Sequence, residues 1–180
     1  MRDFKTKYVL DGQTYHPHIT LYQDHYLIVN LKRVRENLEK VAEKVSQFDI
    51  DMHNFSVISV FIFYDAENSA ELLNLYHAVL ETLHPLREGI LTAADRQILA
   101  DPRVPEKFKQ NIQQYAYAFA KESYIPHVSI TRLVDYQEAE AAKKLLQAQA
   151  MTFTAHELLL TNVGDDGTCN DIYARFQLQS

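Results

Sequence analysis

Two seven-residue segments of the chain have nearly the same chemistry. Residues 15–21 read YHPHITL and residues 124–130 read YIPHVSI, so each contains Pro-His followed by a β-branched, a hydroxyl and an aliphatic residue. The ordinary pKa of a histidine is about 6.5, so its ring can accept or donate a proton near neutral pH. A hydroxyl two positions later can hydrogen-bond an anionic oxygen. Together the two segments contain the groups that acid–base chemistry on a phosphate requires.

The chemistry depends on alternation along a β-strand, where residues i and i+2 point the same way with Cα atoms roughly 6.5 Å apart. Thr20 therefore shares a face with His18, and Ser129 shares a face with His127. If the two segments face each other, one histidine can take a proton from the attacking oxygen while the other protonates the leaving oxygen. The hydroxyls can stabilise the non-bridging oxygens. This scheme needs no metal.

The sequences HITL at 18–21 and HVSI at 127–130 resemble the paired His-x-Thr/Ser-hydrophobic motifs of the 2H phosphoesterase superfamily, which includes 2′-5′ RNA ligase-like proteins and cyclic nucleotide phosphodiesterases. The 109-residue separation of the two histidines is also similar. The resemblance implies metal-independent chemistry on 2′,3′-cyclic phosphates or 2′,5′-phosphodiester bonds, usually with a 2′-phosphate as the product of ring opening. By position, it implies an acid–base pair and two phosphate-binding hydroxyls: His18 and His127, and Thr20 and Ser129.

The chain departs from the family pattern at two places. Only 17 residues precede His18, where family members have a strand–helix unit, so the first lobe is expected to be truncated or rearranged, with residues 8–10 as a remnant strand. Residues 89–105 form a longer connection than usual and contain loop signals. Both departures lie where loops shape a substrate site, so the sequence leaves the physiological substrate open.

Four further residues are candidates for substrate binding. Tyr15 and Tyr124 each lie three positions before a motif histidine, and their rings can either stack on a base or pack in the core. Tyr22 shares the face of His18 and is expected to border the pocket. Arg132 can reach a phosphate as a cation, or it can be solvated or ion-paired, because alternation places it on the face opposite His127.

A metal site is not expected. His16 and His18 form a His-x-His pair that can bind zinc, but no further ligands with suitable spacing accompany it. Cys169 is the single cysteine, which predicts neither a disulfide framework nor a cysteine-rich metal site. The acidic turn at residues 164–167 is interpreted as a hairpin turn. No cofactor is predicted.

The composition is typical of one soluble domain, and we expect a single bilobal domain over residues 1–180. Apolar residues make up 47% and charged residues 23% of the chain. A net charge of −6 argues against a broad nucleic-acid-binding face. A nucleotide, a cyclic phosphate or a short RNA end in a local pocket is the expected partner. No apolar run of about 18 residues and no secretory signal are present, so no membrane association and a cytoplasmic location are expected.

The hydrophobic periodicity predicts the elements that position the motifs. The expected strands cover residues 15–22, 54–64, 126–134, 152–163 and 169–178, with a further short strand at 48–52. The expected helices cover residues 31–48, 70–83, 106–122 and 137–149. This order predicts an α+β fold with pseudo-twofold symmetry, in which two antiparallel sheets line a central cleft and the helices lie outside.

Two classes of function remain open at this stage. The first is a metal-independent phosphoesterase that acts on cyclic phosphates or 2′,5′ bonds through the two histidines. The second is a binding module that holds a nucleotide or phosphorylated ligand in the same cleft without turnover. Intact motifs favour the enzyme.

Overall fold

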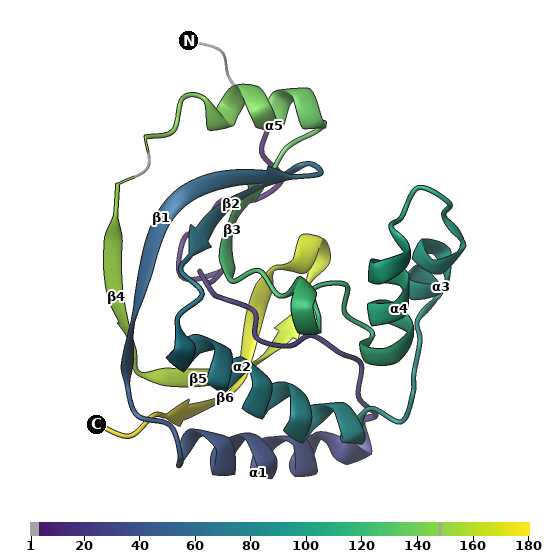
Figure 1. Cartoon of the computed structure of the whole chain (residues 1–180), viewed down its shortest axis with the longest axis vertical. Helices are drawn as coiled ribbons and strands as arrows, with labels where there is room; N and C mark the ends of the chain where they lie inside the picture. Colours follow the sequence, from purple (N-terminus) through teal and green to yellow (C-terminus); the bar gives the residue numbers. More distant parts are fainter. Residues whose placement is uncertain (1–3, 148) are drawn as a thin grey trace.

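The computed structural model describes residues 4–147 and 149–180, and it confirms the predicted α+β class (Figure 1). Its α-helices are α1 (Leu31–Ala42), α2 (Ala70–Leu83), α3 (Ala93–Ala100), α4 (Glu106–Tyr115) and α5 (Tyr136–Lys143). Its strands are β1 (Phe48–Ile58), β2 (Phe61–Ala66), β3 (His127–Arg132), β4 (Met151–Ala155), β5 (Glu157–Val163) and β6 (Cys169–Gln177). Short 3-10 turns occupy Ile28–Asn30 (η1), His84–Leu86 (η2), Lys121–Ser123 (η3) and Asp165–Gly167 (η4).

Two antiparallel sheets form the frame of the molecule. The larger has the strand order β3-β2-β1-β4, and the smaller pairs β5 with β6. The long strand β1 curls across the molecule, pairing with β4 along its first half and with β2 along its second, with a register shift between Met52 and Asn54 (Figure 1). The chain passes from one sheet to the other between β4 and β5, so one long segment contributes to both.

Helices α1 and α2 lie together along one end of the sheets and close the core there (Figure 1). The buried side of α1 has helical spacing and joins residues of β1 and β6 in one apolar cluster. Helix α2 begins at the N-cap Ser69, whose hydroxyl accepts a hydrogen bond from the backbone N–H of Leu72 at 3.2 Å. Helix α2 matches the predicted range, whereas α1 ends at Ala42 instead of residue 48, and Phe48 begins β1.

The strand expected at residues 15–22 is not formed as a continuous strand. Its ladder is reduced to one isolated antiparallel bridge between Ile19 and Val128 of β3. Pro17 has no N–H to donate, and the N–H of His16 donates to the carbonyl oxygen of Cys169 in β6 at 3.1 Å. The segment is therefore shared between β3 and β6, and neither pairing extends far.

Several predicted boundaries were wrong for local reasons. Residues 54–64 form the hairpin of β1 and β2 rather than one strand, with Ser59 at a φ of 59° in the turn. The strand expected at 152–163 divides at His156, because its two halves pair with different sheets. Helix α5 begins at Tyr136 and ends at Lys143, short of the predicted 149; residue 148 of that range lies outside the described residues.

The region expected to be irregular, residues 89–105, contains helix α3. Thr92 and Asp95 form a reciprocal capping box: the Thr92 side chain accepts from the Asp95 N–H at 3.1 Å, and the Asp95 carboxylate accepts from the Thr92 N–H at 2.7 Å. The following helix α4 ends at Tyr115 because Ala116 adopts a left-handed conformation, so it is shorter than the predicted range 106–122. Helices α3 and α4 form an arm beside the larger sheet (Figure 1).

Candidate active site

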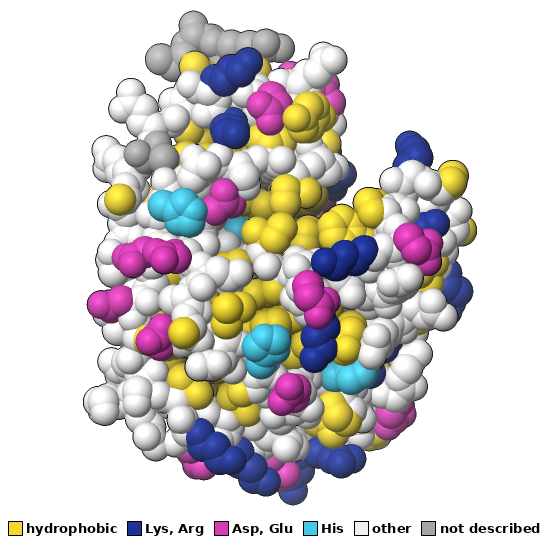
Figure 2. All heavy atoms as spheres, in the orientation of Figure 1, with side chains coloured by type: hydrophobic (Ala, Val, Ile, Leu, Met, Phe, Trp, Pro, Cys, Tyr) yellow, Lys and Arg dark blue, Asp and Glu magenta, His cyan; other side chains and the backbone are white. Residues whose placement is uncertain are grey.

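His127 begins β3 and is held between two aromatic rings. Its imidazole stacks on Phe63 of β2, with ring centroids 3.7 Å apart, and meets Phe119 edge-on at 6.0 Å. Phe119 follows α4, so His127 lies between the larger sheet and the α3–α4 arm. Figure 2 shows a notch between these two parts of the molecule, bordered by hydrophobic side chains.

The two motif histidines make the same local hydrogen bond. Nδ1 of His127 lies 2.6 Å from the carbonyl oxygen of Ile125, and Nδ1 of His18 lies 2.8 Å from that of His16. A carbonyl oxygen only accepts, so each Nδ1 must carry the proton. When the ring is neutral, Nε2 then holds the lone pair and is the nitrogen that exchanges a proton with a substrate.

The bridge between Ile19 and Val128 places the two motifs side by side in opposite directions. Both side chains pack against the main apolar core. In an antiparallel pair, residues next to a bridged position point to the other face. The residues that flank Ile19 and Val128 in sequence are therefore directed away from the core.

Those flanking residues are the four that the motifs predict for chemistry. By the antiparallel register, His18 lies opposite Ser129, and Thr20 lies opposite His127. Each histidine is thus beside the hydroxyl of the other motif as well as two residues from its own. The two rings are close enough to interact electrostatically, since the charge of His18 lowers the pKa of His127. The bridge therefore sets two imidazoles and two hydroxyls next to one another.

The surroundings of His18 favour its protonated form. Burial lowers the pKa of His18, but the Cys169 thiol and the carbonyl oxygens of His16 and Gly167 outweigh it and raise the pKa above its ordinary value. Cys169 begins β6, and its Sγ lies 3.1 Å from Oγ1 of Thr161 on β5. The hairpin of the smaller sheet therefore supplies the polar surroundings of this ring.

The surroundings of His127 favour its neutral form. Burial between aromatic rings lowers the pKa of His127, and the neighbouring charge of His18 lowers it further. The carbonyl oxygen of Ile125 and the carboxylate of Asp65 act in the opposite direction but do not reverse the shift. The two histidines, equivalent in sequence, are therefore unequal in proton affinity.

The three candidate tyrosines differ in their surroundings. Tyr15 lies against the ring of Tyr8 at 5.6 Å and lines a small hollow that also touches His18 and Ser129. Tyr124 is only 6% exposed and stacks on Tyr76 of α2 at 3.9 Å, which favours the packing alternative. The Tyr22 hydroxyl lies 2.7 Å from Oδ2 of Asp24 and 2.9 Å from the carbonyl oxygen of Tyr115, and these two acceptors share its single proton.

Arg132 is ion-paired, which was one of the two alternatives to phosphate binding. At the end of β3, its guanidinium forms an ion pair with Asp166 of η4 and lies over the ring of Phe61, 5.7 Å from the ring centroid. This contact ties β3 to the β5–β6 turn. Direct phosphate binding by Arg132 would have to compete with Asp166.

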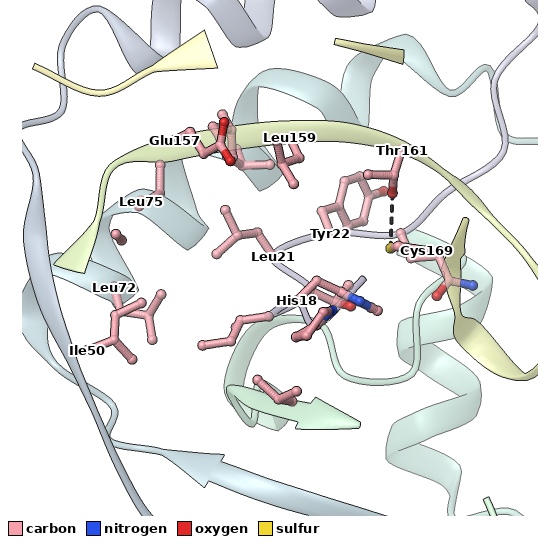
Figure 3. A pocket seen from close by; sticks show the side chains of 18 of the residues that line it. His18, Leu21, Tyr22, Ile50, Leu72, Leu75, Glu157, Leu159, Thr161 and Cys169 are labelled. Atoms are coloured by element: carbon pink, nitrogen blue, oxygen red, sulfur yellow. Dashed lines mark hydrogen bonds between the residues drawn. The ribbon is translucent and has the colours of Figure 1, made fainter. Parts of the chain in front are cut away.

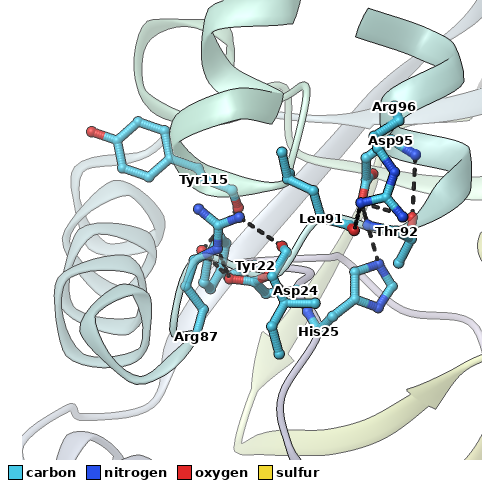
Figure 4. Close-up of polar contacts among 10 residues, drawn as sticks. Tyr22, Asp24, His25, Arg87, Leu91, Thr92, Asp95, Arg96 and Tyr115 are labelled. Atoms are coloured by element: carbon cyan, nitrogen blue, oxygen red, sulfur yellow. Dashed lines mark hydrogen bonds and ion pairs between the residues drawn. The ribbon is translucent and has the colours of Figure 1, made fainter.

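A buried ion pair fixes the chain just after the first motif (Figure 4). Nε of Arg87 lies 3.1 Å from Oδ2 of Asp24, and the two side chains are 5% and 0% exposed. The guanidinium also donates to the carbonyl oxygens of Ile90, at 2.9 Å, and Gln114. The Tyr22 hydroxyl shares the same carboxylate, so the segment that carries His18 is anchored to η2 and to the end of α4.

Sequence reasoning did not find Cys169, Phe63 or Phe119 beside the histidines, nor the pair of Asp24 and Arg87. Cys169 and Arg87 lie far from the motifs in the chain, Asp24 and Phe119 lie within eight residues of a motif histidine, and none of these residues has a spacing that marks it. A lone cysteine signals nothing by itself. The register of β6 against residue 16 brings Cys169 to His18, the pairing of β2 with β3 brings Phe63 to His127, and the position of the α4 arm brings Phe119 there.

Over residues 4–147 and 149–180, no group of three or more His, Cys, Asp or Glu side chains is arranged to hold a metal ion. The His-x-His pair at residues 16 and 18 is thus without a third such ligand in this part of the chain. None of the helices in these residues is long and apolar enough to cross a membrane.

The chain belongs to the 2′-5′ RNA ligase superfamily, whose sequence profile matches residues 11–167, a range that contains both motifs. Its fold is similar to that of TT0787 of Thermus thermophilus, with a TM-score of 0.54 and 12% sequence identity over 91% of this chain and 79% of that chain. At this identity the likeness shows the fold alone. No curated protein matches the sequence.

Proposed function

We propose that this protein is a metal-independent phosphoesterase that acts on 2′,3′-cyclic phosphates or 2′,5′-phosphodiester bonds of nucleotides or RNA ends. The observation that carries the proposal is the antiparallel bridge between Ile19 and Val128, because it sets the four polar motif residues on one face. Membership of the 2′-5′ RNA ligase superfamily supports the same class of chemistry.

The opposite pKa shifts of the two histidines support a division of roles in ring opening. His127, neutral near pH 7, takes a proton from the attacking water on Nε2 as the new P–O bond forms. His18, protonated, gives its Nε2 proton to the leaving ribose oxygen as the old P–O bond breaks. Thr20 and Ser129 donate hydrogen bonds to the non-bridging oxygens. His127 then releases its proton to solvent, and His18 takes one up from solvent, which restores the starting state.

The direct test is incubation with 2′,3′-cyclic AMP in the presence of a chelator, followed by chromatographic separation of 2′-AMP and 3′-AMP. We expect turnover to a single isomer, the 2′-phosphate, because one fixed acid serves one leaving oxygen. Saturable binding of the nucleotide without product over long incubation would contradict the enzyme and favour the binding module.

The pH profile of kcat/KM is expected to be bell-shaped. As the pH rises through the lowered pKa of His127, the base loses its proton and activity increases. As the pH rises further through the raised pKa of His18, the acid loses its proton and activity decreases. The optimum therefore spans the range on both sides of the ordinary histidine pKa. A profile that rises through one ionisation and stays level would refute the assignment of roles.

Removal of the Cys169 thiol is expected to move only the alkaline limb of this profile. Cys169→Ala takes away a contact that raises the pKa of His18, so the decrease in activity should begin at lower pH. The acid limb, set by His127, should remain in place. A parallel displacement of both limbs would show that the substitution acts through the fold rather than through His18.

A further inference from the structure

A large cavity lies behind the first motif, between β1, α2, β5 and the chain from residue 18 to 24 (Figure 3). Its volume is about 680 Å³. Pockets that bind small molecules typically measure roughly 300–1,000 Å³. The cavity is thus as large as a ligand site, yet the proposed chemistry on a phosphate does not account for most of it.

The two ends of the cavity differ in chemistry. Figure 3 shows Ile50, Leu72 and Leu75 at one end and His18 and Cys169 at the other, with Leu21 between them. At the polar end Cys169 also contacts the Thr161 hydroxyl. We name this space the chamber. Its long apolar part begins directly beside a proposed catalytic histidine.

The apolar end of the chamber suits a hydrocarbon group, because aliphatic side chains form its wall. Water is a poor occupant where isoleucine and leucine side chains offer it no hydrogen-bond partners. A hydrocarbon group matches the apolar end, and an anionic head matches the imidazole of His18 and the Thr161 hydroxyl at the other.

We propose that the chamber binds an amphiphile with a phosphate head beside His18 and a hydrocarbon tail along Leu21, Leu72 and Leu75. The placing of the head rests on the proposed function, in which His18 serves a phosphate. The tail site is independent of turnover, because it needs only the apolar wall. The ligand class that follows is an alkyl phosphate ester rather than a nucleotide alone.

Isothermal titration with inorganic phosphate, butyl phosphate and octyl phosphate, below the micellar range, tests the chamber. Each methylene that leaves water strengthens binding. We therefore expect octyl phosphate to bind at least tenfold more tightly than butyl phosphate, and butyl phosphate more tightly than inorganic phosphate. Equal affinity for the three would overturn the proposal.

Two leucines of the same helix provide matched variants. Leu75 lines the chamber, whereas Leu80, also buried on α2, packs in the separate cluster around Tyr76. Leu75→Phe should fill free space, keep Tm close to wild type and remove the preference for octyl phosphate. Leu80→Phe should overpack its cluster and lower Tm, while the preference for octyl phosphate remains. A retained preference in Leu75→Phe would contradict the chamber.

Leu21→Phe, in the middle of the chamber, is a second filling variant and gives the same readout if Leu75→Phe does not fold. Turnover of 2′,3′-cyclic AMP is measured separately. If the two histidines are needed for turnover but the affinity for alkyl phosphates does not depend on tail length, the chamber proposal is refuted and the proposed function stands. If the affinity depends on tail length but turnover does not need His127, the proposed function is refuted and the chamber proposal stands.

Discussion

Replacing either motif histidine with alanine is expected to lower kcat/KM toward 2′,3′-cyclic AMP by about 10²- to 10⁴-fold, the usual contribution of a positioned acid or base. His127→Ala removes the base, and His18→Ala removes the acid. In both rings Nδ1 is bound to a backbone carbonyl, so Nε2 is the nitrogen lost to the reaction. Steady-state kinetics on the purified variants measures the effect.

His53→Ala is the matched control, because His53 is an exposed histidine on strand β1 outside the motifs. It should keep wild-type activity. Circular dichroism and thermal unfolding should show that all three variants remain folded. If either motif variant kept activity within a few-fold of wild type, the two-histidine mechanism would fail, whatever the fold of the chain.

The sequence could nominate the residues of the candidate site because the information is local. A hydroxyl two residues after a histidine shares its face in any extended segment, whether or not a full ladder forms. The first motif shows this, since its predicted strand reduces to one bridge and its alternation is still kept: Ile19 and Leu21 pack on the core. The class of fold follows from alternation and helical spacing in the same way.

The inequality of the two histidines could not be predicted from the sequence. The repeated motif makes them equivalent, and the difference comes from partners that only tertiary structure supplies. Cys169 reaches His18 through the pairing of residue 16 with β6, and Phe119 reaches His127 through the position of the α4 arm. The antiparallel crossing that sets each histidine opposite the hydroxyl of the other motif is likewise a matter of register.

Helix α3 is different, because its signal was present in the sequence. Thr92 and Asp95 have the spacing of a capping box, but Asp101-Pro102 and Val104-Pro105 nearby favoured a loop over the whole region. The prolines do interrupt the chain between α3 and α4, as expected. The capping box marks the start of α3, whereas the prolines mark only its end, so they do not argue against a short helix between them.

Loss of the Asp24 carboxylate should be the most damaging change outside the histidines. Removing one partner of a buried ion pair leaves the other charge uncompensated, at a cost of about 3–5 kcal/mol in the free energy of unfolding. Asp24→Ala would leave the Arg87 guanidinium buried and deprive the Tyr22 hydroxyl of an acceptor. Urea unfolding followed by circular dichroism measures the loss.

An exposed ion pair and a double variant show whether burial is the cause. Glu36→Ala breaks the solvent-exposed contact with Lys32 on α1 and should cost less than about 1 kcal/mol. Asp24→Leu combined with Arg87→Met removes both buried charges, so it should be more stable than Asp24→Ala alone. If Asp24→Ala were no worse than Glu36→Ala, the anchor behind the first motif would not depend on this pair, and the position of His18 would have to be held by its backbone contacts with β3 and β6.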